Sequence, residues 1–342
     1  MSTHPTSTVP LSAAPEESDH DLVQRLMNGR ARIEAELGKV IVGQREVIGQ
    51  IMLALLAGGH CLITGAPGLA KTLLVKSISQ IFDLHFQRIQ FTPDLMPADI
   101  TGTEILQDAG HGARSMTFVP GPIFANMVLA DEINRTPPKT QAALLEAMQE
   151  HQVTAMGVRH PLAEPFFVLA TQNPIEMEGT YPLPEAQLDR FMFNVVMDYL
   201  PESEEVEVVT RTTSGRPVRI ESLFTGADVQ RFHELVQQVP VTQELVTFAV
   251  RLAAASRPRQ PDTPDFVNDW VSWGAGTRAG QSLILGAKAR ALFNGRVHVK
   301  LEDIQALAAP VLRHRVLLNY RAEAEAVRID DVIQRLVAHV KP

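Results

Sequence analysis

The sequence has little cysteine and no long apolar segment, and each shortage excludes a class of protein. A single cysteine, Cys61, occurs among 342 residues. No disulfide can therefore form within the chain, and no thiolate cluster can hold a metal, so we expect a protein of the reducing cytoplasm. The longest uncharged apolar runs, such as residues 51–56, are far shorter than the roughly 20 residues that a membrane-spanning helix needs. The sequence predicts no membrane span.

The chain also lacks a dense block of lysine and arginine, and its formal net charge is -8. A protein that grips nucleic-acid phosphates needs a basic surface, so nucleic acid is not the expected partner. Residues 1–18 are rich in Ser, Thr, Pro and Ala and lack the charged and apolar regions of a signal peptide. We predict a disordered tail over residues 1–20.

The remaining pattern indicates two domains, an α/β core over residues 21–200 and a small helical domain over residues 201–342. Short apolar runs separated by helical patterns are typical of a parallel sheet covered on both faces, which makes three layers. The predicted strands are residues 61–63, 86–89, 127–130 and 166–170. In the second domain the predicted helices are residues 227–236, 243–255, 279–293, 301–314 and 329–340. Another helix is expected to be capped by Thr136 and to have Pro137 at its first position.

A candidate phosphate-binding loop follows the first predicted strand. The loop reads Gly65, Ala66, Pro67, Gly68, Leu69, Ala70, Lys71 and Thr72. Its backbone N–H groups would face the phosphates, Lys71 would reach the outer phosphates, and the Thr72 hydroxyl would ligate Mg²⁺. Ala70 stands where the general Walker A pattern has glycine, and we expect alanine to fit if its backbone avoids positive φ. A plain strand-to-helix turn with a surface lysine would have the same spacing.

Polar residues end two further predicted strands. Asp131 and Glu132 follow residues 127–130, and Asn173 follows the strand that ends near residue 170. Such strand ends meet at the ligand-binding edge of a parallel sheet. We expect Asp131 to hold hydrated Mg²⁺ and Glu132 to polarise the attacking water, with Asn173 near the γ-phosphate. A lone acidic pair is often only a solvated strand end, so the order of the motifs carries this hypothesis.

From about Leu22 to the C-terminus, the chain resembles the MoxR family of AAA+ ATPases, in the helix-2-insert clade. The most specific stretches are residues 65–72, 131–148 and 182–191. The resemblance implies that Val42, Gly43 and Gln44 lie by the adenine and that Asn173 is the sensor-1 residue. It also implies that Arg190 is an arginine finger and Arg278 a sensor-2 arginine. Gly276 and Thr277 stand before Arg278 where the family usually has Ser-Pro.

The same resemblance implies two hairpin inserts, residues 101–124 within a core helix and residues 152–165 before sensor 1. It further implies hydrolysis of ATP with Mg²⁺ in a homo-oligomeric, hexameric ring. This ring would remodel a protein client for complex maturation or for metal or cofactor insertion. A protein with a von Willebrand factor type A domain is an expected partner. Three alternatives stay open: a magnesium chelatase-like subunit, a nucleic-acid motor, and an ATP-gated scaffold with little turnover.

Overall fold

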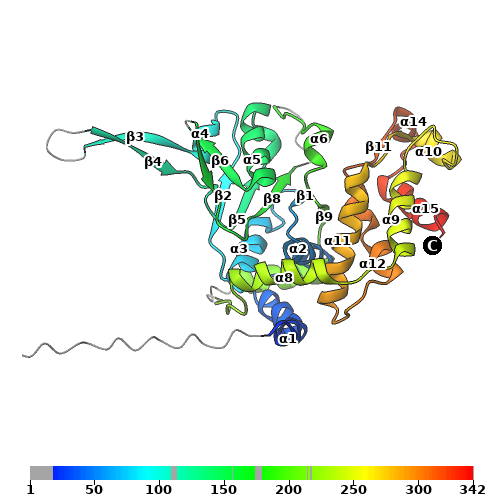
Figure 1. Cartoon of the computed structure of the whole chain (residues 1–342), viewed down its shortest axis with the longest axis horizontal. Helices are drawn as coiled ribbons and strands as arrows, with labels where there is room; N and C mark the ends of the chain where they lie inside the picture. Colours follow the sequence, from blue (N-terminus) through cyan, green and yellow to red (C-terminus); the bar gives the residue numbers. More distant parts are fainter. Residues whose placement is uncertain are drawn as a thin grey trace, which may run out of the picture.

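A five-stranded parallel sheet forms the centre of the larger part of the molecule (Figure 1). The computed structural model describes residues 18–108, 114–155, 157–173, 179–213, 215 and 218–341. The strand order is β2-β5-β8-β1-β9. The strands are β1 (Cys61–Gly65), β2 (Phe86–Gln90), β5 (Met127–Asp131), β8 (Phe167–Gln172) and β9 (Phe193–Met197). The α/β class and the four predicted strands are confirmed. The edge strand β9 is missing from the predicted set because Asn194 interrupts its apolar run.

Helices cover both faces of the sheet, as the three-layer prediction requires. They are α1 (Asp19–Gly38), α2 (Arg45–Ala57), α3 (Lys71–Ile81) and α5 (Pro138–Glu150). Successive side chains of a strand point to opposite faces. Cys61 and Ile63 accordingly pack in the apolar cluster of α1, α2 and α3, whereas Leu62 packs in the cluster of α5. In β5, Leu129 packs in the cluster of α1, α2 and α3, and Val128 packs in the cluster of α5.

Two hairpins extend from this core where the two inserts were predicted. The first is built from β3 (Gly102–Asp108) and β4 (Arg114–Pro120), which point away from the body in Figure 1. The second is built from β6 (Gln152–Ala155) and β7 (Val158–Pro161). The rings of Phe118 and His160 stack with centroids 4.0 Å apart, so the two hairpins touch.

The first hairpin does not interrupt a longer helix, contrary to the prediction. Only the short α4 (Pro97–Thr101) precedes it, and residues 121–126 after β4 form turns and bends. A Cβ on Gly121 would lie 2.2 Å from the carbonyl oxygen of Ile100. The chain therefore turns back tightly against the end of α4, which leaves no room for a helix to resume there.

The start of α5 also differs from the prediction. Pro138, rather than Pro137, is its first residue, and Pro137 has an extended backbone with ψ of 154°. A residue that precedes proline is pushed out of the helical region, which explains the shift. The Thr136 hydroxyl does not cap the helix but donates to the carbonyl of Ile133 at 3.4 Å.

The chain after residue 200 is mainly helical, as predicted. Its helices are α7 (Glu202–Thr212), α8 (Gly226–Gln238), α9 (Gln243–Ala255), α10 (Asp265–Trp270), α11 (Thr277–Phe293), α12 (Leu301–Ala306), α13 (Ala308–Leu312), α14 (Tyr320–Ala324) and α15 (Ile329–His339). The single helix predicted over residues 301–314 is wrong, because Pro310 has no N–H and would clash with the carbonyl of Ala306. A short ribbon of β10 (Val271–Trp273) and β11 (Leu317–Leu318) also interrupts the helical pattern.

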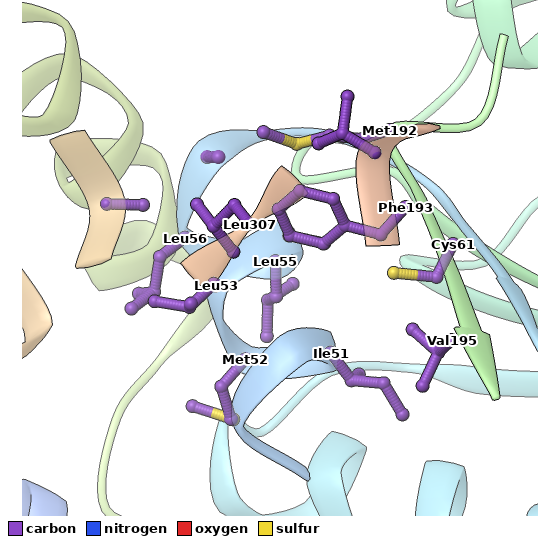
Figure 2. Packing of buried hydrophobic residues seen from close by; sticks show 14 of the residues in the cluster. Ile51, Met52, Leu53, Leu55, Leu56, Cys61, Met192, Phe193, Val195 and Leu307 are labelled. Atoms are coloured by element: carbon purple, nitrogen blue, oxygen red, sulfur yellow. The ribbon is translucent and has the colours of Figure 1, made fainter. Parts of the chain in front are cut away.

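The helical part and the α/β part share one apolar core. Figure 2 shows Leu307, which follows α12, near Phe193 of β9 and the leucines of α2. A Cβ on Gly286 of α11 would lie 2.9 Å from both Leu307 and Phe193. Glycine at this position therefore permits close packing of α11 on the sheet edge.

The predicted domain limits stay predictions, apart from one detail at the N-terminus. Helix α8 packs against both α2 and α11, so the helical part makes contacts well inside the core. Asp19 and His20 belong to α1, which Ser18 caps, so the last residues of the predicted tail are helical. Residues 1–17 lie outside the described residues. Among the described residues, no helix is both long and apolar enough to cross a bilayer.

A buried histidine joins α5 to the sheet and makes folding sensitive to pH. His60 accepts a hydrogen bond from the Val168 N–H at Nδ1 (3.2 Å), and its Nε2 donates to the Met148 carbonyl (3.0 Å). Both nitrogens are used by the neutral ring. Burial lowers the pKa of His60 from 6.5 to about 4. Between these two pH values only the unfolded chain binds a proton at this residue. The contribution of the neutral His60 ring to the free energy of unfolding is therefore fully present above pH 6.5, and it is lost as the pH falls towards 4.

We expect His60→Gln to remove this pH dependence, because glutamine can make both hydrogen bonds but does not titrate. Each pKa unit corresponds to about 1.4 kcal/mol, so the wild-type protein should lose about 2 kcal/mol more than the variant between pH 7 and pH 5. Urea unfolding of both proteins at the two pH values measures this difference. Equal losses in the two proteins would contradict the assignment.

Candidate functional site

The predicted phosphate loop connects β1 to α3, as its chemistry requires. Helix α3 begins at Lys71, and no side chain caps its N-terminus. Such a helix end presents N–H groups and the positive end of the helix dipole to an anion. The Lys71 Nζ donates to the Gly65 carbonyl at 2.6 Å. Burial lowers the pKa of Lys71, whereas the neighbouring Asp131 and Glu132 carboxylates act to raise it.

Backbone geometry explains the two glycines of the loop. A Cβ on Gly65 would lie 2.5 Å from the carbonyl oxygen of Met197 in β9, so a larger residue would push β1 and β9 apart. Gly68 has φ of +84°, which glycine adopts without strain, and the space where its Cβ would point is open. The loop surface at Gly68 is therefore bare backbone, suited to a close approach by phosphate.

Ala70 has a positive φ, contrary to the expectation from the sequence. Its backbone has φ of 59° and ψ of 26°, in the left-handed region. An alanine there costs roughly 1–2 kcal/mol. Residues held in such conformations concentrate at ligand-binding sites, where the surrounding structure imposes them. Ala70 therefore occupies this position in a strained backbone conformation, which the surrounding loop imposes.

The acidic pair at the end of β5 is held by its neighbours on both sides. The Thr171 hydroxyl in β8 donates to Asp131 Oδ1 at 2.6 Å and accepts from the Glu132 N–H at 2.8 Å. On the other side, Arg88 in β2 donates to Asp131 Oδ2 from Nη2 (2.6 Å) and Nε (3.0 Å). Both oxygens of Asp131 are therefore oriented.

Glu132 has a strained backbone and an oriented carboxylate. Its φ of 58° lies in the left-handed region. Gln90 Nε2 in β2 donates to Glu132 Oε2 at 2.9 Å, and Arg135 Nε lies 3.3 Å from the same oxygen. Arg135 belongs to the 3₁₀ turn η1 (Ile133–Arg135) directly after Glu132. The side chain is thus directed by the strand beside it and by the turn that follows it.

The parallel registers bring the predicted catalytic residues to one edge of the sheet. Ala130 of β5 pairs with Ala170 of β8, and Thr64 of β1 pairs with Gln172 of β8. Asn173 follows β8 directly and is only 7% exposed. Lys71, the acidic pair and Asn173 therefore come from the carboxyl ends of three adjacent strands, where such sheets bind ligands.

The segment predicted to lie by the adenine adjoins this edge. Gly43 has φ of 65° and Gln44 has φ of 53°, and the Gln44 Nε2 donates to the Asp198 carbonyl just after β9 at 2.9 Å. Gln44 lines a cavity of about 480 Å³ with Leu200 and with Asp330 of the helical part. Val42 and Gly43 line a second cavity, of about 540 Å³. The segment of residues 42–44 therefore lines cavities, one of which also borders the end of β9 and the helical part.

The predicted arginine finger, Arg190, lies at the opposite end of the sheet from the phosphate loop. Phe193 at the start of β9 pairs with Cys61, and Met197 at its end pairs with Gly65, the first residue of the phosphate loop. Arg190 precedes this strand. The four steps of β9 alone span about 13 Å at 3.3 Å per residue. Arg190 is therefore too far from the phosphate loop of its own chain to contact a nucleotide bound there.

Arg278 lies at the start of α11, near the residue that precedes Arg190. Its Nη1 is 3.9 Å from Asp189 Oδ2, and Asp189 is the residue before Arg190. Arg190 itself donates from Nη1 to the Leu145 carbonyl of α5 at 2.5 Å. Arg190 thus contacts the α/β part, and Arg278 of the helical part lies near the residue before it.

The residues at the phosphate edge fit a magnesium-bound nucleotide. The Thr72 hydroxyl and the Asp131 carboxylate offer the oxygen ligands that Mg²⁺ prefers, and Mg²⁺ commonly takes one or two protein carboxylates together with substrate phosphates. Within the described ranges, no group of three or more His, Cys, Asp or Glu side chains could hold a metal alone. The uncapped end of α3 and the bare backbone at Gly68 suit the phosphates.

Three residues of this site are missing from the prediction: Thr171, Arg88 and Gln90. Thr171 follows four apolar residues of β8, and a polar residue at that place was an available signal. Arg88 and Gln90 gave no such signal, because β2 (FQRIQ) mixes polar and apolar residues. Gln90 pairs with Asp131 in the β2–β5 register, which places it next to the acidic pair. Only the strand order showed that β2 is the neighbour of β5.

Comparison with known proteins agrees with this geometry. Residues 60–193 match the family described as "ATPase family associated with various cellular activities (AAA)", and residues 266–336 match the "AAA lid domain". The chain is 42% identical over 305 residues to "Chaperone MoxR1" of Mycobacterium tuberculosis, covering 89% of this chain and 80% of that protein. It is 27% identical over 332 residues to "Protein MoxR" of Methylorubrum extorquens, covering 91% of this chain and 94% of that protein.

A solved structure shows the same architecture. A crystal structure of a protein from Cytophaga hutchinsonii superposes with a TM-score of 0.87 at 40% identity, covering 94% of this chain and 97% of that one. Together with the phosphate loop, the acidic pair and the helical lid, these similarities establish the family. The chain belongs to the MoxR family of AAA+ ATPases.

Proposed function

We propose that this protein binds ATP with Mg²⁺ at the carboxyl edge of its sheet and hydrolyses it as a homo-oligomer. The observation that carries the proposal is the division of the candidate catalytic side chains between two ends of the sheet. Lys71, the acidic pair and Asn173 lie at one end, and Arg190 and Arg278 lie at the other. A site divided in this way is completed when a second subunit supplies the arginines.

Within one subunit, each residue has a separate task. The backbone of residues 65–70 and the Lys71 ammonium would hold the phosphates, and Thr72 and Asp131 would hold the metal. Bound Mg²⁺ supplies positive charge that offsets charge developing on the transferring phosphoryl group. Glu132 would accept a hydrogen bond from the attacking water and orient it, and Asn173 would orient the water or the outer phosphate. Thr171 and Gln90 support these tasks by fixing the acidic pair.

The neighbouring subunit would complete the site with Arg190 and Arg278. An arginine offered from outside stabilises the charge of the transferring phosphoryl group. The position of both arginines far from their own phosphate loop supports action in trans for the pair. By resemblance, we propose a hexameric ring.

The energy of hydrolysis would be used to remodel a protein client in the cytoplasm. The name of the M. tuberculosis relative, a chaperone, supports this class of activity. We propose assistance to complex maturation or to metal or cofactor insertion, with a partner that carries a von Willebrand factor type A domain. The β3–β4 hairpin supports contact with a client, since its Leu106 and Met116 side chains are exposed.

The dependence of turnover on protein concentration tests the oligomeric site. We expect phosphate release per subunit to rise steeply with concentration and to level off where sedimentation shows that assembly is complete. Subunits diluted below assembly should bind a fluorescent ATP analogue but hydrolyse ATP slowly, because the arginines are absent. Full turnover by monomers would refute the divided site.

A further inference from the structure

A buried arginine of the lid grips the segment that carries Arg190. Arg315 follows α13, and its side chain is only 2% exposed. It donates to the Phe191 carbonyl at 2.7 Å and to the Met192 carbonyl at 3.1 Å. It also donates to the Asp189 carbonyl at 3.2 Å and to Asp189 Oδ1 at 2.6 Å. One guanidinium therefore binds the backbone on both sides of Arg190.

The residue before Arg315 reinforces this grip. His314 is buried, and its Nε2 donates to the same Phe191 carbonyl at 2.9 Å. A planar guanidinium presents donors in a fixed fork, which makes it suited to holding several acceptors in one geometry. The segment of residues 189–192 is thus bound to the lid by a set of hydrogen bonds that a lysine could not reproduce.

Asp189 links this grip to the second arginine of the pair. Its Oδ1 accepts from Arg315, and its Oδ2 lies 3.9 Å from Arg278. The carboxylate is partly exposed at 31%, whereas Arg315 is buried and needs a partner for its charge. Asp189 consequently lies between the buried Arg315 and the partly exposed Arg278.

We propose that Arg315 and Asp189 are positioning residues for the two arginines that act on the nucleotide of the neighbouring subunit. Arg315 sets the backbone of Arg190, and Asp189 orients Arg278 against the same anchor. The position of the lid is thereby transmitted to the neighbour's active site and not to the site of the same chain. The inference rests on the proposed ATP hydrolysis with Arg190 in trans.

The first variant to measure is Asp189→Asn, which keeps the side-chain shape but removes the charge between Arg315 and Arg278. A small misplacement of catalytic groups can reduce rate by up to about a hundredfold, and we expect kcat to fall at least about tenfold. The KM for ATP should stay within about twofold, because the phosphate loop of the same chain is untouched. Asp269→Asn is the matched control, since it removes the exposed partner of Arg321 in the lid and should leave kcat unchanged.

Mixed oligomers distinguish positioning from a structural role. Asp189→Asn subunits are mixed with an excess of Glu132→Gln subunits, which do not hydrolyse ATP but offer an intact Arg190 to their neighbours. We expect the turnover of each Asp189→Asn subunit to recover most of the rate that wild-type subunits show in the same mixture. A residue that served only its own site or its own fold would show no recovery.

Arg190→Ala subunits in the same mixture separate the two hypotheses. Recovery of Arg190→Ala without recovery of Asp189→Asn would overturn the positioning role alone. Failure of both would overturn action in trans, and with it this inference. Arg315→Lys, checked for folding by circular dichroism, should behave as Asp189→Asn does, because lysine keeps the charge but lacks the fork. Wild-type turnover by a folded Arg315→Lys protein would equally overturn the proposal.

Discussion

Glu132→Gln should abolish turnover while leaving ATP binding intact. A positioned general base contributes about 10²- to 10⁴-fold to rate, so we expect kcat to fall by at least about 10²-fold. Glutamine has nearly the same shape, and its amide oxygen can still accept the hydrogen bond that Gln90 donates to Glu132. The phosphate loop and Asp131 are unchanged, so nucleotide affinity should stay within about twofold. Phosphate release measures the first effect, and titration with a fluorescent ATP analogue measures the second.

The matched control for this variant is Glu150→Gln, an exposed glutamate at the end of α5. It removes the same charge at the far end of α5, away from the phosphate edge, and should leave kcat unchanged. Undiminished hydrolysis by Glu132→Gln would remove Glu132 from its role as the base. The acidic pair would then need a different division of tasks, with the water oriented by Asn173 or by a residue of the neighbour.

Arg190→Ala should have the second large effect, and it should appear only in the rate. Arginine fingers are worth about 10³- to 10⁵-fold in kcat, so we expect a loss of about 10³-fold or more. Binding of ATP should be unaffected, because the arginine lies at the opposite end of the sheet from its own phosphate loop. The same phosphate-release and titration measurements apply, at concentrations where sedimentation shows that oligomers are complete.

Arg251→Ala, at an exposed position on α9, is the control for the loss of one arginine. It should keep wild-type turnover. A loss of ATP affinity in Arg190→Ala that matches the loss of rate would indicate action on the site of the same chain. Loss of oligomers in the variant would instead assign Arg190 a role in assembly, and the sedimentation profile separates these outcomes.

Local motifs allowed much of the site to be predicted. The phosphate loop, the acidic pair and Asn173 each lie at the end of an apolar strand, and the carboxyl ends of parallel strands share one edge of the sheet whatever the strand order. Their place at one edge therefore followed from the pattern, whereas their proximity depended on β5, β8 and β1 being neighbours. The backbone conformation could not be predicted, since nothing in the local pattern showed that Ala70 and Glu132 adopt positive φ.

Residues that support the acidic pair could not be found in this way. Arg88 and Gln90 lie about forty residues before the acidic pair in the chain, and only the pairing of β2 with β5 brings them beside it. The edge strand β9 was missed, and with it the reason for Gly65, whose closest constraint is the Met197 carbonyl of that strand. The helix limits at Pro138 and Pro310 follow from local proline chemistry, which the sequence alone contains.

The sequence by itself determined which residues carry the proposed chemistry: a candidate phosphate loop, a carboxylate pair and Asn173, each recognised by short-range spacing along one strand and its end. Only the tertiary structure decided which strands are neighbours, that Arg190 lies at the other end of the sheet, and which side chains hold the acidic pair. The physical reason is that strand order, register and lid packing depend on contacts between residues far apart in the chain, such as Arg315 with Phe191. Those contacts leave no local period or spacing in the sequence.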